Sequence, residues 1–180
     1  MKILFLIFCI GLILNSDPQQ RQEFVCLPCG YECDKELHTG PGICPSCHMN
    51  LVEKSTINFT DLSVSEFCNR IISNPKAVLL DVRTPGEFRG NTKEVETFGH
   101  FKNAINVNAA DLEQRLGELS QYKDVEVLVY CSHNHRSPAA SYFLSTHGFK
   151  HVKNMTGGVS TLVGKQENDC LKKSFVFHTY

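Results

Sequence analysis

The stretch VEVLVYCSHNHRSPAASYFLSTHG (residues 125–148) joins an apolar run, a polar loop and a helical pattern. The apolar run is rich in β-branched side chains, which is typical of a buried parallel strand. Ser137 and Pro138 form an N-cap and N1 pair, and the helix they begin is expected to end near His147 and Gly148. Cys131 therefore lies where a buried strand ends and a helix is about to begin.

Similar patterns recur on both sides of this stretch. AVLLDV (residues 77–82), NAINVN (103–108) and HVKNM (151–155) are further candidate strands. Ser63 and Glu66 have capping-box spacing ahead of a helix that runs to about Ile72. Asp111 is expected to cap a helix over LEQRLGEL, in which three leucines share one face. Strands that alternate with helices predict an open parallel α/β sheet flanked by helices.

Composition limits the classes of function. The chain has 180 residues and a hydrophobic fraction of 42%, enough for one ordinary domain and a smaller second unit. Its 18 basic and 19 acidic residues give a net charge of −1, without a long basic run. Because proteins that bind nucleic acid usually present a basic patch, we expect no nucleic-acid partner.

The first residues have the features of an export signal. Lys2 supplies a positive charge, and residues 3–14 form an apolar run that polar residues follow. The run is shorter than the roughly 20 residues that span a bilayer, and its length suits a signal peptide. We expect residues 1–16 to be a signal peptide, the mature protein to be periplasmic or secreted, and no stable membrane span to remain. The alternative is a buried N-terminal helix.

Cysteine is concentrated in residues 24–54, a block with few apolar residues. Cys26-x2-Cys29 and Cys44-x2-Cys47 have the spacing with which two tight turns present four thiolates to one tetrahedral ion. Zn²⁺ is the expected ion, and Cu⁺ is the alternative because soft ligands also favour it. A disulfide knot is the competing interpretation in an oxidising compartment.

The second half of this block, PGICPSCHMNLVEK (residues 41–54), resembles the small heavy-metal-binding domain of exported metal-handling proteins. His48 stands where that family usually has glycine, and Cys33 is an additional cysteine. The resemblance implies a metal-binding ribbon, in which the bound ion stabilises a segment that has no core of its own.

Residues 57–164 resemble a single rhodanese domain. LLDVRTPGEF (79–88) matches its strand-and-turn motif, and GHFKNAINV (99–107) matches a second motif, with Asn103 in place of the usual glycine. Residues 129–159 match its active-site strand, loop and helix and the G-F-x-x-V-x-x-M-x-G-G run that follows. The resemblance implies a rhodanese-like fold, with residues 165–180 as a C-terminal tail or an added strand.

The same resemblance implies a sulfurtransferase that needs no cofactor for its reaction. Cys131 would be the nucleophile and would carry a persulfide from a small anionic donor, thiosulfate or a polysulfide, to a thiol or cyanide. Arg136 would hold the donor and steady the leaving group. The loop of six residues, C-x4-R, is one residue shorter than that of related phosphatases, which favours sulfur over phosphate. The residues expected to bind the persulfide through loop amides and side chains are Ser132, His133, Asn134, His135 and Ser137.

Other residues receive structural interpretations. Asp81 and His100 are expected to be architectural, and Arg83 and Glu87 to form a structural ion pair. Cys68 is interpreted as an apolar filler. Cys33 and Cys170 stay open: either could resolve the persulfide, they could pair with each other, or they could do neither.

His133 and His135 admit three interpretations. They are exposed loop imidazoles, contacts for an anion or a proton, or members of a metal site with Cys131. The last conflicts with a Cys131 that must stay free to react.

Two other functions compete with sulfur transfer. The first is a non-catalytic metal-handling or metal-sensing module that uses the rhodanese fold to bind a partner. The second is a thiol redox protein, which is disfavoured because neither CxxC opens a helix after a strand.

Overall fold

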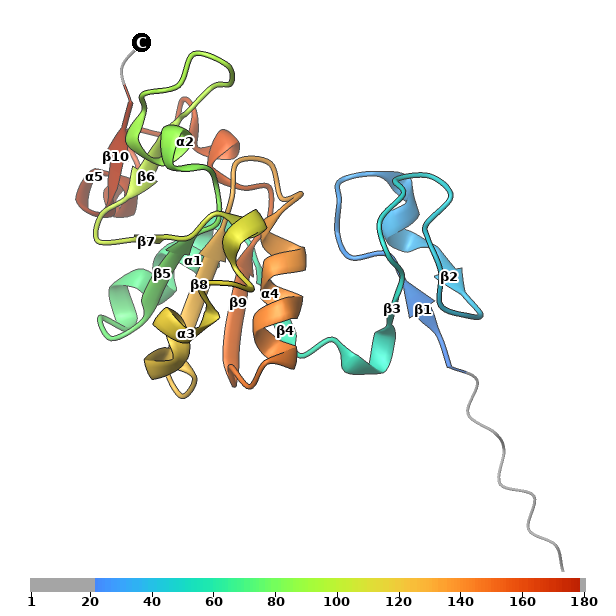
Figure 1. Cartoon of the computed structure of the whole chain (residues 1–180). Helices are drawn as coiled ribbons and strands as arrows, with labels where there is room; N and C mark the ends of the chain where they lie inside the picture. Colours follow the sequence, from blue (N-terminus) through green and yellow to red (C-terminus); the bar gives the residue numbers. More distant parts are fainter. Residues whose placement is uncertain (1–21, 179–180) are drawn as a thin grey trace, which may run out of the picture.

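A five-stranded parallel sheet forms the larger part of the computed structural model, which describes residues 22–178 (Figure 1). The predicted signal peptide, residues 1–16, lies outside the described residues. Within residues 22–178, no helix is both long enough and apolar enough to cross a bilayer. The predicted open parallel sheet is confirmed. In spatial order its strands are β4 (Phe59–Leu62), β9 (His151–Met155), β8 (Glu126–Tyr130), β5 (Val78–Asp81) and β7 (Ile105–Asn106).

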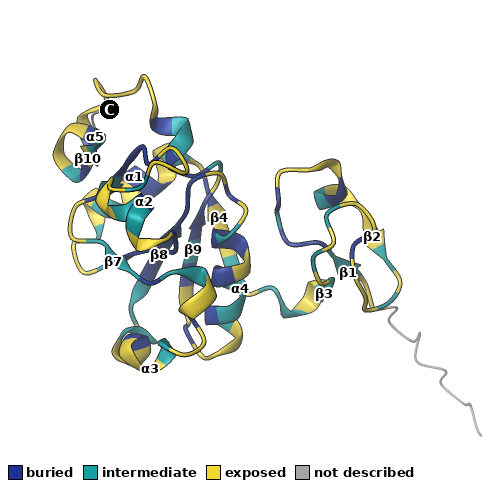
Figure 2. Cartoon of the chain, turned by 45° about the horizontal axis from the view of Figure 1, so that its top comes forward, coloured by how far each residue is buried: buried dark blue, intermediate teal, exposed yellow. Residues whose placement is uncertain are grey.

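The central strand β8 contributes to two hydrophobic cores, one on each face of the sheet. Leu128 and Tyr130 pack into the first core, while Val127, Val129 and Cys131 pack into the second. Alternate side chains of a strand point to opposite faces, so a strand covered on both sides needs an unbroken apolar run. Figure 2 shows the buried residues following the sheet strands. This explains why the run before Cys131 shows no polar alternation.

Helices cover the sheet, and two of them follow predicted signals. The capping box at Ser63 is present, and α1 begins directly after it. Helix α4 begins at Ser137, with Arg136 as its N-cap, one residue earlier than predicted. The helices are α1 (Val64–Ser73), α2 (Pro85–Arg89), α3 (Leu116–Leu119), α4 (Ser137–Thr146) and α5 (Asp169–Ser174).

The helix expected after Asp111 is shorter than predicted. Asn108 caps a 3₁₀ helix, Ala109–Asp111, and α3 begins only at Leu116. The N-cap of α3, Arg115, has a backbone conformation outside the helical region (φ −100°, ψ 7°). Gly117 lowers the helix propensity of the segment further. Leu112 and Leu119 are nevertheless buried, so the predicted apolar face is kept although the helix is interrupted.

The C-terminal residues add a helix and a strand to the domain. Strand β10 (Phe175–Phe177) pairs antiparallel with β6 (Gly99–Phe101), which confirms the added strand. Helix α5 is joined to α1 by a disulfide between Cys68 and Cys170. The interpretation of Cys68 as an apolar filler was therefore wrong. The sequence did not indicate the bond, because the partner lies 102 residues away and no local pattern connects the two cysteines.

The N-terminal block forms a small three-stranded antiparallel sheet around its cysteines. The strands are β2 (Leu37–His38), β1 (Phe24–Val25) and β3 (Val52–Glu53), in that order. A 3₁₀ helix, Glu32–Lys35, follows the first cysteine pair, and another, Lys54–Thr56, leads to the larger domain. We call residues 24–54 the ribbon. Four cysteines form its buried cluster, and Met49 and Leu51 pack against them.

The disulfide gives a test of stability. Replacing both partners (Cys68→Ser with Cys170→Ser) is expected to lower the free energy of unfolding by about 2–5 kcal/mol, because a bond across a long loop restricts the unfolded chain. Urea unfolding of the double variant and the wild type measures this. As a control, alkylation of the denatured, unreduced wild type should leave Cys68 and Cys170 unmodified. Alkylation of both would contradict the bond.

Candidate active site

Cys131 follows the last residue of the central strand β8 and begins the loop that leads into α4. Its side chain is only 1% exposed, and its thiol donates a hydrogen bond to the Ser137 hydroxyl at 3.3 Å. In open α/β sheets, ligands bind at the carboxyl ends of the strands. The positive end of the α4 dipole lies on the same side as the loop and stabilises an anion there.

Asn134 gives the loop its shape. Its φ is +63°, in the left-handed region that asparagine tolerates better than most residues. Its side-chain oxygen accepts a hydrogen bond of 2.9 Å from Asn154 of β9, and the same Asn154 amide donates to Asp61 of β4 at 2.6 Å. Two neighbouring strands therefore anchor the tip of the loop.

The turn that follows β9 is hydrogen-bonded to the start of the loop. The amide of Val159 donates to the Cys131 carbonyl at 2.9 Å, and that of Ser160 donates to the Ser132 carbonyl at 3.0 Å. A Cβ at Gly158 would lie 2.3 Å from the Ser132 carbonyl oxygen, so only glycine permits this approach. The G-G pair of the sequence pattern thus has a physical role in holding the loop.

The backbone amides of the loop are available to donate hydrogen bonds to a ligand. Among the described residues, no backbone carbonyl takes a hydrogen bond from the amides of residues 132 to 137. A run of backbone amides beside a helix N-terminus is a common cradle for anions. Ser132, Asn134 and Ser137 are buried at this site, whereas His133 and His135 are exposed.

Arg136 forms an ion pair with Glu87, which the sequence analysis had paired with Arg83. Its two terminal nitrogens each donate to a Glu87 oxygen at 2.7 Å, and one also donates to the Ser132 hydroxyl at 2.6 Å. The predicted pair of Arg83 and Glu87 was wrong. Arg83 instead binds Asp81 from a fully buried position, with Nη2 to Oδ2 at 2.6 Å. The two side chains diverge because Arg83 faces the sheet interior while α2 turns Glu87 toward the loop.

Glu87 is buried at 3% exposure and is held ionised. Burial by itself raises the pKa of this carboxyl, but hydrogen bonds from Arg136 and from the Thr84 backbone outweigh it and lower the pKa to about 2. The hydrogen bond to Glu87 in turn raises the pKa of Arg136. Thr84 and Glu87 form a capping box at the start of α2, which fixes the carboxylate in place.

The two loop histidines point to different surroundings. His133 packs edge-on against Phe98, with ring centroids 5.4 Å apart. His135 contacts the ribbon: its ring centroid lies 6.1 Å from that of Tyr31, and a Cβ at Gly30 would be 3.4 Å from its Nε2. The described metal-ligand groups include neither histidine. The first cysteine turn of the ribbon is therefore a neighbour of the loop of residues 131–137.

Two hollows flank Arg136. One of about 400 Å³ includes Glu87, Ser132 and His133, together with Glu94 and Glu96 from the segment before β6. The other, of about 340 Å³, is more apolar and lies between the α4 side of the loop and residues 109–113. Both open beside the loop, and Arg136 lines each of them.

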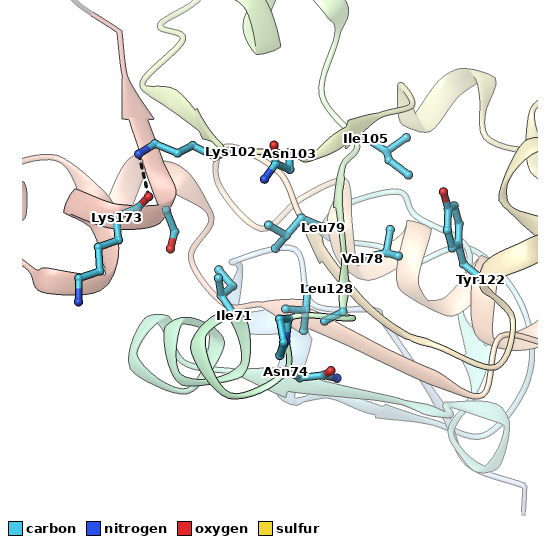
Figure 3. A pocket seen from close by; sticks show the side chains of 13 residues that line it. Ile71, Asn74, Val78, Leu79, Lys102, Asn103, Ile105, Tyr122, Leu128 and Lys173 are labelled. Atoms are coloured by element: carbon cyan, nitrogen blue, oxygen red, sulfur yellow. Dashed lines mark hydrogen bonds between the residues drawn. The ribbon is translucent and has the colours of Figure 1, made fainter.

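A third hollow, of about 480 Å³, lies away from the loop (Figure 3). Ile71, Val78 and Leu128 line its apolar wall. Lys102 stands at its rim, where its amine donates to the Lys173 carbonyl at 2.7 Å. None of its lining residues belongs to the loop of residues 131–137, so it forms no part of this site.

The ribbon gathers thiols that fit a metal ion. The sulfur atoms of Cys26, Cys29, Cys33 and Cys47 all lie within 4.8 Å of one another, and Cys26 and Cys47 approach to 3.1 Å. Thiolates at about 2.3 Å from a tetrahedral Zn²⁺ have similar mutual spacing. Cys44, a predicted ligand, is buried in the same cluster, but Cys33 takes its place in the four-thiol group.

Asp34 holds the first cysteine turn of the ribbon. Its carboxylate accepts hydrogen bonds from the amides of Cys29 and Gly30, both at 2.9 Å, and from the Cys29 thiol at 3.0 Å. The carboxylate therefore connects the thiol cluster to Gly30, the neighbour of Tyr31, whose ring faces His135. The spacing of the CxxC pairs identified the ribbon, but it did not indicate that Cys33 or Asp34 belongs to this cluster.

Comparison with known proteins places the larger domain in a family. A family model described as the rhodanese-like domain matches residues 63–165, more than half of the 180-residue chain. The chain belongs to the rhodanese-like domain family. This confirms the fold class predicted from the sequence.

The curated relatives are longer than this chain. The tRNA uridine(34) hydroxylase of Cronobacter sakazakii is 30% identical over 112 residues, which make up 60% of this chain and 30% of that protein. That of Wigglesworthia glossinidia brevipalpis is 30% identical over 125 residues, or 64% of this chain and 37% of that protein. The chain thus spans about a third of the length of these relatives.

Solved structures resemble the larger domain. The reduced CoADR-RHD protein of Bacillus anthracis matches at a TM-score of 0.50 and 25% identity, over 66% of this chain and 18% of that chain. A Saccharomyces cerevisiae homologue of single-domain rhodanese and of the Cdc25 phosphatase catalytic domain matches at a TM-score of 0.50 and 15% identity, over 69% and 91%. The second likeness supports the fold alone.

The left-handed residue of the loop gives a matched pair of variants. Asn134→Ala is expected to be less stable than Asn134→Gly by about 1–2 kcal/mol, because alanine resists a positive φ and glycine does not. Both variants lose the hydrogen bond from Asn154, so their difference isolates the backbone conformation. Urea unfolding measures the difference, and equal stability would contradict the left-handed conformation.

Proposed function

We propose that this chain is an exported sulfurtransferase that carries sulfane sulfur as a persulfide on Cys131. The observation that carries the proposal is the position of this thiol. It ends a buried strand and begins a loop whose amides make no hydrogen bond to a described backbone carbonyl, beside the N-terminus of α4. A sulfur anion there is stabilised by the helix dipole and by oriented amides.

The reaction proceeds in two displacements. The Cys131 thiolate attacks the outer sulfur of a donor, thiosulfate or a polysulfide-type molecule; a new S–S bond forms at Cys131 while the donor's S–S bond breaks. The leaving group departs with the electron pair as sulfite or a shortened sulfide chain. A thiolate or cyanide then attacks the outer sulfur of the persulfide and restores the Cys131 thiolate. Ser137, whose hydroxyl accepts from the Cys131 thiol, orients the nucleophile.

Export is part of the proposal. The disulfide between Cys68 and Cys170 supports an oxidising compartment, because such bonds persist in secreted and periplasmic proteins. The apolar N-terminal run, residues 3–14, supports passage through a secretory pathway. A periplasmic or secreted protein would meet its sulfur donors outside the reducing cytosol.

The ribbon would hold one metal ion through four cysteines. Zn²⁺ suits the four-thiol group best, with Cys26, Cys29 and Cys47 common to both candidate sets and Cys33 or Cys44 as the fourth ligand. Cu⁺ is the alternative ion because its preference is also for soft ligands. When bound, the ion supplies folding free energy to a segment whose buried cluster consists mainly of thiols.

A metal-handling or metal-sensing module is the second candidate. The contact between the ribbon and His135 favours it, because a change at the cysteine turn would be felt at the loop. In this candidate the rhodanese fold binds a partner and Cys131 does not react. The tRNA reaction in the names of the relatives is not carried over, since the similarity covers about a third of them.

Intact-mass spectrometry tests sulfur transfer. After incubation with a sulfane donor, the wild type is expected to gain the mass of one sulfur atom, which cyanide then removes as thiocyanate. Cys131→Ser should show neither the adduct nor thiocyanate, whereas Cys170→Ser, at a disulfide remote from the loop, should keep both. A wild type that stays unmodified by thiosulfate, polysulfide and persulfide would refute the proposal and leave the metal-binding module.

Metal analysis tests the ribbon and its fourth ligand. Protein purified without added metal is expected to contain about one Zn²⁺ per chain, since four thiolates form a closed site. Cys33→Ser and Cys44→Ser are the matched pair: the variant of the true ligand should lose the metal to a weak chelator. Metal-free protein with oxidised ribbon cysteines would instead favour the disulfide knot.

A further inference from the structure

The fixed cation of the loop is already neutralised. Arg136 and Glu87 form a two-point ion pair in which both terminal guanidinium nitrogens are taken up by the carboxylate. One of these nitrogens also donates to Ser132, so the three side chains form a closed ring of hydrogen bonds. Because the pair as a whole has no net charge, it attracts an anionic donor only weakly.

Glu87 is held in this ion pair by further hydrogen bonds. The Thr84 amide and hydroxyl both donate to its Oε2 at 3.0 Å, which ties the carboxylate to the first turn of α2. The carboxylate is almost completely buried. It also stays ionised at any pH near neutrality, because its pKa is about 2. Its negative charge is therefore a permanent part of the site.

The remaining charges around the pocket are mostly negative. Glu94 and Glu96 line the hollow that Glu87 and Arg136 share, and the other titratable side chain there is His133. His135, the second loop imidazole, faces Tyr31 of the ribbon. Three carboxylates thus stand against one guanidinium, so a donor with two negative charges enters an unfavourable potential.

We infer that Glu87 is a specificity-determining residue that directs Cys131 to organic persulfides of low charge and away from dianionic thiosulfate. This inference rests on the proposed sulfur transfer and specifies its donor. With a persulfide R–S–SH, the Cys131 thiolate attacks the outer sulfur, the donor's S–S bond breaks, and R–S⁻ leaves with the electron pair. Cys131–S–SH keeps the proton, so one negative charge is present throughout.

Thiosulfate brings more negative charge into the same site than an organic persulfide does. Its attack by a thiolate brings together three negative charges, which are then shared between Cys131–S–S⁻ and sulfite. A free arginine would stabilise thiosulfate bound beside the Cys131 thiolate, whereas an arginine paired with Glu87 would not. Glu87 therefore acts through Arg136 and through its own charge, as a positioning residue rather than a catalytic one.

Comparison of two donors tests this role. For wild type and Glu87→Gln, kcat/KM is measured with thiosulfate and with cysteine persulfide, which carries no net charge at its zwitterionic end. Glu87→Gln keeps the side-chain shape but frees Arg136. We expect its kcat/KM for thiosulfate to rise about tenfold or more, mainly through a lower KM, while that for the persulfide falls as the loop is held less firmly.

A matched control separates the ion pair from the general charge of the pocket. Glu96→Gln removes a carboxylate from the same hollow, and no hydrogen bond joins Glu96 to Arg136 among those described. It should change the ratio of the two kcat/KM values by less than about threefold. Equal losses with both donors in a folded Glu87→Gln would overturn the inference, because Glu87 would then serve only the structure of the loop.

Salt dependence of the wild type gives a second test that needs no variant. If the site repels dianions, added KCl should raise kcat/KM for thiosulfate, because screening weakens repulsion. A decrease with salt would show a net positive site and would overturn the inference. If neither donor modifies Cys131 in the wild type, the proposed function fails instead, so the two failures are distinguishable.

Discussion

The ion pair between Glu87 and Arg136 connects the two loops on which the site depends. Glu87 follows β5 and Arg136 follows β8, and these strands are neighbours in the sheet. The pair is strong because each oxygen meets one guanidinium nitrogen at 2.7 Å in a half-buried setting. Removing either partner would leave a charge with little solvent around it. It fixes both the loop geometry and the charge beside Cys131.

The buried ion pair between Arg83 and Asp81 helps to position the pair between Glu87 and Arg136. Arg83 is fully buried and binds Asp81 through two nitrogens, and it also donates to the carbonyls of Thr97 and Gly99. These bonds turn the chain sharply after β5 and attach that turn to the segment leading into β6. Helix α2 can then begin at the right place to aim Glu87 at the loop. The shape of the turn is therefore maintained by buried polar groups that have hydrogen-bond partners.

Two positions that depart from the family patterns share a backbone conformation with Asn134 of the loop. His48 and Asn103 replace the glycines of the two family patterns, and both have a φ near +60°, as does Asn134 in the loop. Glycine reaches this region without cost, while asparagine is the side chain that tolerates it best. The substitutions therefore keep the backbone course. At Asn134 the side chain also contributes an anchor to β9 that glycine lacks.

The sequence by itself determined the fold class, and it predicted residues 131–137 as the candidate reactive loop. Apolar runs of the right length, capping signals and the spacing of the CxxC pairs are local properties, and they predicted four strands of the parallel sheet, the start of α1 and the ribbon. Cys131, Ser132, Asn134, Arg136 and Ser137 were brought together because they are close in the chain and lie between a strand and a helix.

Only the tertiary structure decided which distant side chains meet. Glu87 and Arg136 are 49 residues apart, and Cys68 and Cys170 are 102 apart. Periodicity shows that a strand is buried, but it does not show which strand lies beside it or which way a flanking helix faces. The order of strands in the sheet placed β5 next to β8, and this made Glu87 part of the site rather than the partner of Arg83.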